Sequence, residues 1–124
     1  MRLTSAAGLF AVVSLLCAGE AFAAPVELVC KSNGSEAHLS IDLDAGSVIW
    51  TGQTFHAEVS DTQVHWAGIM PVGRGPNGPD IDATLDRDTG TLVTSQEAGA
   101  DPDSGIRWGS AHTTWACVKA QRIL

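Results

Sequence analysis

Residues 37–48 read AHLSIDLDAGSV and contain the two patterns that decide the fold. Leu39, Ile41 and Leu43 alternate with polar residues. Such alternation is typical of a strand that is buried on one face only, as in an antiparallel sheet. The Asp-Ala-Gly that follows is the chemistry of a tight turn, with Gly46 suited to a left-handed backbone position. The stretch therefore predicts a strand, a turn and a second strand.

The same alternation recurs along the chain, and no helical periodicity competes with it. Alternating segments lie at residues 54–60, 63–67 and 81–86, and shorter strand candidates at residues 26–30, 47–51, 91–95, 106–108 and 113–119. Further turn signals separate them at residues 60–63 and 88–91. Many short strands at this spacing predict an all-β fold, a small antiparallel barrel or sandwich of about eight strands.

Composition and charge exclude several classes of protein. The 124 residues are enough for one domain, and 44% hydrophobic with 17% charged residues exclude wholesale disorder. No apolar run reaches the roughly 18 residues that a membrane-spanning helix needs. The net charge of −7 disfavours nucleic acid and anionic lipid as partners and favours a cationic protein or a small ligand.

The first residues have the layout of a cleaved secretory signal. Arg2 supplies a positive charge, residues 6–18 are apolar or small, and residues 21–23 read Ala-Phe-Ala. We predict a signal peptide at residues 1–23, cleaved there or one residue later, and a single β domain at residues 24–124. The protein is then expected in the periplasm or secreted.

Two cysteines remain after the predicted cleavage, because Cys17 leaves with the signal. Cys30 lies near the start of the domain and Cys117 near its end. In an exported protein such a pair predicts a disulfide, which here would join the first strand to the last and close the sheet. The alternative is a metal-thiolate or redox pair, although the chain has no CxxC motif.

The order of these motifs resembles that of small exported β-rich bacterial proteins of unassigned activity. An early Cys30 is followed by IDLDAGSV at residues 41–48, by D-T-x-V at residues 61–64, by LDRDTGTL at residues 85–92 and by a late Cys117. The resemblance implies an exported β domain and brings no catalytic residues with it.

A second similarity is to the periplasmic inhibitors of c-type lysozyme, which are small β-barrels with joined terminal cysteines. Their signature is a Ser-Gly-x-x-Tyr loop followed by Trp-x-x-Gly. This chain has Ser104-Gly105 and Trp108-Gly109 but no Tyr at any position. The similarity implies inhibition of a basic cell-wall hydrolase.

One group of side chains has the composition of a metal site. If the strands at residues 54–60 and 63–67 form a hairpin, Glu58 faces His65, and His56 lies diagonally on the same outward face. Two imidazoles and a carboxylate are ligands for Zn²⁺ or Cu²⁺. The alternative is a solvated polar face with one Glu–His pair across the strands.

The remaining candidates for ligand contact are Trp108, Trp115 and Arg74. The two tryptophans either stack on a ligand or pack over one end of a barrel. Arg74 lies in a Gly- and Pro-rich loop at residues 68–80, and a second long loop at residues 96–105 is acidic. Loops of this length are either functional or mobile.

The sequence contains no GxSxG or HExxH motif, and no thiol is left over after the predicted disulfide. We therefore expect no enzymatic activity and no cofactor. The expected function is that of an exported binding or accessory protein of the bacterial envelope. The alternative is the inhibitor of a basic cell-wall hydrolase such as lysozyme.

Overall fold

The computed structural model describes residues 24–120, which form ten β-strands and no helix. The strands are β1 (Val26–Ser32), β2 (Ser35–Asp42), β3 (Ser47–Trp50), β4 (Gln53–Val59), β5 (Gln63–Ile69), β6 (Asp80–Asp86), β7 (Thr91–Gln96), β8 (Gly99–Ala100), β9 (Arg107–Trp108) and β10 (Ala111–Lys119). The expected signal at residues 1–23 lies outside the described residues. Within them, no helix long and apolar enough to cross a bilayer occurs.

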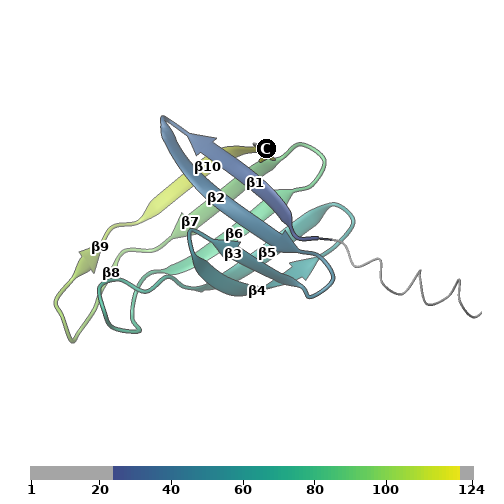
Figure 1. Cartoon of the computed structure of the whole chain (residues 1–124). Coiled ribbons are helices and arrows are strands. Elements are labelled where there is room, and N and C mark those ends of the chain that lie inside the picture. The colour runs from purple at the N-terminus through teal and green to yellow at the C-terminus, as the bar shows by residue number, and fades with distance from the viewer. Residues whose placement is uncertain (1–23, 121–124) are drawn as a thin grey trace, which may run out of the picture.

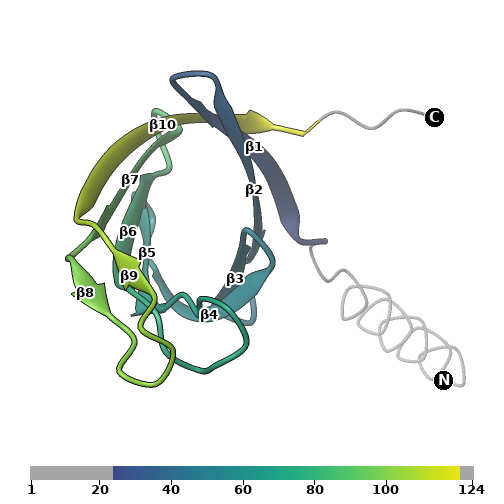
Figure 2. The same ribbon diagram turned by 90° about the vertical axis from the view of Figure 1, so that its left-hand side faces the viewer.

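Eight of the strands form a closed antiparallel barrel in which β10 returns to pair with β1 (Figures 1 and 2). Every other neighbouring pair in the barrel is consecutive in the chain, apart from β7 and β10, between which the β8–β9 hairpin is inserted. The prediction of an all-β antiparallel fold is confirmed, and a barrel rather than a sandwich is formed. Closure removes the free edges that an open sheet would expose.

The alternating residues of the strands fill the barrel interior. Leu39 and Ile41 are buried, as the alternation in β2 predicts, and so are Leu92 and Trp66 on the far side. The full buried apolar set is Cys30, Ala37, Leu39, Ile41, Val48, Trp50, Phe55, Ala57, Val64, Trp66, Ile81, Ala83, Leu85, Leu92 and Cys117. These side chains come from all eight barrel strands, so one core stabilises the whole ring.

The predicted disulfide is confirmed. Cys30 and Cys117 face each other across β1 and β10, and their sulfur atoms are 2.06 Å apart. The bridge therefore fastens the first strand of the barrel to the last, at the place where the ring closes.

The two ends of the barrel differ in their connections. One end, here called the turn end, has the short turns at residues 43–46, 60–62 and 87–90, and it is also the end where β1 begins and β10 ends. The other end, the loop end, has the connection at residues 70–79 and the segment that contains β8 and β9, besides two tight turns. In Figure 2 these longer segments gather at one end of the ring. Among residues 24–120, no long loop covers the turn end.

Candidate functional site

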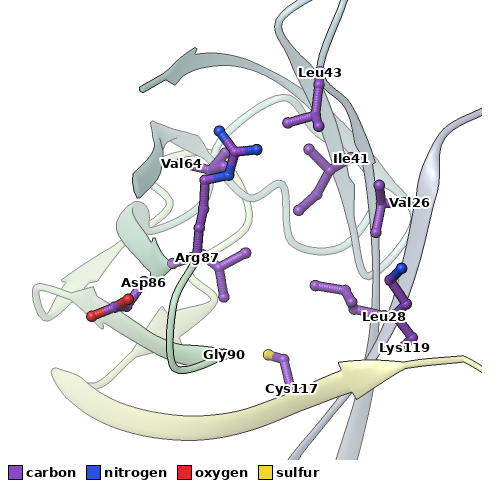
Figure 3. A pocket seen from close by; sticks show the side chains of 11 residues that line it. Val26, Leu28, Ile41, Leu43, Val64, Asp86, Arg87, Gly90, Cys117 and Lys119 are labelled. Atoms are coloured by element: carbon purple, nitrogen blue, oxygen red, sulfur yellow. The ribbon is translucent and has the colours of Figure 1, made fainter. Parts of the chain in front are cut away.

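The turn end of the barrel is hollowed into a cup of about 320 Å³ (Figure 3). The residues around it are Val26, Leu28, Ile41, Leu43, Val64, Leu85, Asp86, Arg87, Gly90, Cys117 and Lys119. Its wall is mostly aliphatic. Leu39 lies two residues from Ile41 on β2, and Trp66 lies two residues from Val64 on β5. Both side chains are on the same inward face, are buried and fill the barrel interior. The cup is therefore a blind hollow, with a volume at the lower end of the range of small-molecule sites.

Two turns of the same construction frame the cup, at residues 42–46 and 86–90. In each, the amide of the closing glycine donates to the carbonyl oxygen of the opening aspartate at 2.9 Å. The φ angles of Gly46 and Gly90 are 67° and 78°. Residues other than glycine rarely adopt a positive φ. The residue after the aspartate is Leu43 in one turn and Arg87 in the other, and both line the cup. The shared turn chemistry thus places one apolar and one cationic side chain at the same rim.

Two cations line the cup, Arg87 and Lys119, and Figure 3 shows them on opposite sides of it. The Arg87 guanidinium also donates through Nη1 to the carbonyl oxygen of Ser60, which holds it in place. Asp86 is the one carboxylate at the cup, and in Figure 3 it is turned away from the hollow. Its Oδ1 accepts two backbone amides of its own turn, at 2.9 and 3.2 Å. Two of the three charged side chains that line the cup are therefore cations.

The expected metal group is brought together only in part. Glu58 faces His65 across β4 and β5, as the hairpin predicts, with His65 Nδ1 3.8 Å from Glu58 Oε1. The second nitrogen of this ring, Nε2, lies 3.1 Å from Oδ1 of Asp82 on β6. His56 is exposed on the same face of β4, two residues before Glu58, and its backbone partner on the other neighbouring strand is Ser47 of β3. In the described part of the chain, no three His, Cys, Asp or Glu side chains are grouped so as to hold a metal ion.

Sequence reasoning missed Asp82 because its contact with His65 needs the register of β5 against β6. Thr84 is the residue directly opposite His65, and Asp82 is its diagonal neighbour on the same outward face. A local hairpin pattern does not contain this information, since a ten-residue connection separates the two strands. His65 is therefore a cross-strand bridge between two carboxylates of β4 and β6.

Trp115 points into the barrel near the loop end. Its ring meets Trp50 edge to face, with centroids 5.3 Å apart, and its Nε1 donates to Thr94 Oγ1 at 3.0 Å. Both tryptophans border a second hollow of about 220 Å³. The indole of Trp115 thus combines core packing with a satisfied polar group, and its partners are Trp50 and Thr94 rather than Trp108 and Arg74.

Trp108 and Arg74 lie on separate segments outside the barrel core. Trp108 in β9 packs over Gly99 of β8, where a Cβ would lie 2.8 Å from the indole Nε1. Arg74 is exposed in the connection between β5 and β6. The prediction of a loop at residues 96–105 is wrong in part, because this segment contains β8. The lack of a side chain at Gly99 leaves room for the Trp108 indole, so β8 can pair with β9 in a small hairpin.

Asp101 fastens the two long connections to each other, and sequence reasoning missed it. It is 3% exposed. Its carboxylate accepts Ser104 Oγ at 2.7 Å, Asn77 Nδ2 at 3.0 Å and the backbone amide of Asp103 at 3.1 Å. These hydrogen bonds, first that of Ser104 and then that of Asn77, lower the pKa of Asp101 below its usual value. The loop end is therefore held by one ionised side chain.

Comparison with protein-family models, with curated proteins and with solved structures finds no match to this chain, so its function is argued from the geometry of the cup.

Proposed function

We propose that this chain is an exported, non-enzymatic binding protein of the bacterial envelope and that the cup is its ligand site. The observation that carries the proposal is the aliphatic hollow at the turn end of a covalently closed barrel. Concave, mostly apolar hollows with a few polar groups are the usual form of small-molecule sites in proteins. A blind hollow with fixed walls suits a small ligand better than a protein partner.

The groups that face the cup support binding rather than catalysis. Val26, Leu28, Ile41, Val64 and Leu85 are aliphatic, so they exclude water and supply neither a nucleophile nor a general base. The rim carboxylate is occupied by the amides of its own turn. What the wall supplies is the hydrophobic contribution to affinity, about 25 cal/mol for each Å² of apolar surface that a ligand buries.

The disulfide supports export. Disulfides form and persist in compartments that are not reducing, and Cys30 and Cys117 are bonded. Together with the expected signal at residues 1–23, this bond favours the periplasm or the exterior as the place where the protein acts.

The test is binding of a neutral apolar fluorophore, N-phenyl-1-naphthylamine, to the oxidised domain. Leu43→Trp fills the cup from its rim, and Val118→Trp adds the same side chain to the outer face of β10, where Val118 is 63% exposed. We expect saturable binding to the native protein and to Val118→Trp, and a loss of affinity of at least tenfold in Leu43→Trp. Absence of binding, or equal binding to all three proteins, would overturn the proposal.

A second candidate function is inhibition of a basic cell-wall hydrolase such as lysozyme. The observation that favours it is the acidic outer surface on the two sides of β5, where Glu58 on β4 and Asp80 and Asp82 on β6 are exposed in a protein of net charge −7. Such a surface attracts a cationic enzyme. In a turbidity assay with bacterial cells, equimolar protein should slow lysis by lysozyme, and unchanged lysis would remove this candidate.

A further inference from the structure

We propose that the cup selects aliphatic carboxylates of medium chain length, with the tail against the apolar wall and the carboxylate between Arg87 and Lys119. This inference rests on the proposed function, because it names the ligand class of the same hollow. It follows from three properties of the cup: the position of its cations, the lack of an ion pair at either cation among residues 24–120, and the closed floor.

The position of the cations is the first argument. The sequence has seven Lys and Arg residues, and five of them are described, since Arg2 and Arg122 are not. Two of these five line the cup of a protein whose net charge is −7. Lys119 reaches it because it follows Cys117 on the inward face of β10, and Arg87 because of its place in the turn. Two of the few cationic side chains of this protein, Arg87 and Lys119, are therefore available to a ligand in the cup.

The second argument is that neither cation of the cup forms an ion pair with the described residues. Lys31, on the outer face of β1, lies 3.9 Å from the Glu36 carboxylate. Neither Arg87 nor Lys119 forms an ion pair with any carboxylate of residues 24–120. Asp86 and Asp88 flank Arg87 in its turn, but neither Arg87 nor Lys119 is engaged in an ion pair within the described part of the chain, so both can contact an anionic head group. The guanidinium offers a planar fork of donors, which matches the two oxygens of a carboxylate.

The closed floor sets the length of the tail. Behind the wall, Leu39 and Trp66 are each 1% exposed and occupy the barrel interior. A ligand tail can fill the cup of about 320 Å³ but cannot run through the barrel. Each methylene that enters the cup should improve affinity about fourfold. Affinity should therefore rise from hexanoate to about decanoate and then stop rising.

The test is displacement of N-phenyl-1-naphthylamine by three ligands with the same tail: decanoate, decanol and decyltrimethylammonium, all below their micellar concentrations. We expect decanoate to displace the probe at a concentration about tenfold lower than decanol, because two exposed ionic contacts, each at the upper end of the usual range, contribute that much together. The cationic ligand should be the weakest. A series from hexanoate to tetradecanoate should show the plateau in chain length.

Charge variants identify the head-group contacts. Lys119→Gln, combined with Arg87→Gln, should remove the preference for decanoate over decanol, and Lys31→Gln with Arg74→Gln should leave it unchanged. Lys119→Gln alone guards against a folding defect, because Arg87 also supports a turn, and it should reduce the preference by severalfold.

Three results would overturn the inference: equal displacement by decanoate and decanol, displacement by neither, or a preference that survives the double variant at the cup. If the neutral probe still binds and Leu43→Trp still abolishes its binding, the proposed function stands and only the ligand class is wrong. If the probe does not bind, both fail.

Discussion

Reducing the bond between Cys30 and Cys117 to two thiols should destabilise the barrel by several kcal/mol without any amino-acid substitution. The two residues are 87 positions apart in the chain, so the bond restricts nearly the whole domain in the unfolded state. For a loop of this size the chain-entropy relation gives about 4.6 kcal/mol at 25 °C. A domain of this length is typically stable by about 5–15 kcal/mol, so the loss is a large fraction of the total.

The native barrel itself changes little on reduction. The backbone pairing of β1 with β10 extends over four residue pairs, from Leu28 with Lys119 to Lys31 with Ala116, and needs no bond between the sulfur atoms. The reduced protein should therefore still close into a barrel, but it unfolds to a more expanded chain. We expect the free energy of unfolding to fall by about 4.6 kcal/mol, the denaturant slope to rise, and the melting temperature to fall on the order of 20 °C.

Urea unfolding with and without a phosphine reductant measures this difference. The fluorescence of Trp50, Trp66 and Trp115 reports the barrel interior, and far-ultraviolet circular dichroism reports the sheet. A variant with alanine at both cysteine positions is the control, and the reductant should not affect it. A loss below about 1 kcal/mol on reduction would refute the view that the bond acts on the unfolded chain.

Three further perturbations test the packing and the turns. Gly90→Ala should lower the free energy of unfolding by about 2 kcal/mol more than Gly34→Ala does. Both glycines have a positive φ, but only at Gly90 would the new Cβ lie 2.6 Å from a backbone carbonyl oxygen of β10. Equal losses of stability in thermal melting would contradict this prediction. Leu92→Ala should cost about 3 kcal/mol in urea unfolding, since this side chain is completely buried, whereas Val118→Ala should change stability by less than about 0.5 kcal/mol; similar losses would mean that the barrel interior is loosely packed. The lowered pKa of Asp101 means that the folded loop end binds a proton less readily than the unfolded chain, so its stabilisation is present at neutral pH and is lost as the pH falls through that lowered pKa. The amide chemical shifts of β8 and β9 should move in acid, below about pH 4, and Asp101→Asn should produce the same shifts at pH 7. If the spectrum of the variant is like that of the native protein, the Asp101 carboxylate does not hold the two connections together.

Local patterns predicted the elements of the barrel well, because each strand records its buried face as alternation. Residues 37–43 became β2 and the start of its turn, and Glu58 faces His65 as the short hairpin requires. The choice between barrel and sandwich was not available from such patterns. It depends on the pairing of β1 with β10, and only the two cysteines carried a signal for it.

The cup was harder to predict because it forms where the ends of distant strands meet. One signal was available: IDLDAGSV and LDRDTGTL have the same turn chemistry, so Leu43 and Arg87 must occupy equivalent positions. A second was the spacing of Lys119 from Cys117, which puts both on one face of a strand. What the sequence does not contain is which turns gather at the same end, since that follows from the order of strands in the closed ring.

The pairing of β1 with β10 also bears on how the protein is made. Until β10 has been synthesised, β1 and β7 each present an unpaired edge, and a nascent chain that stops short of residues 111–119 has nothing with which to cover them. Exposed edges of this kind pair with other chains. A truncation within β10 should therefore give aggregates instead of a smaller soluble ring.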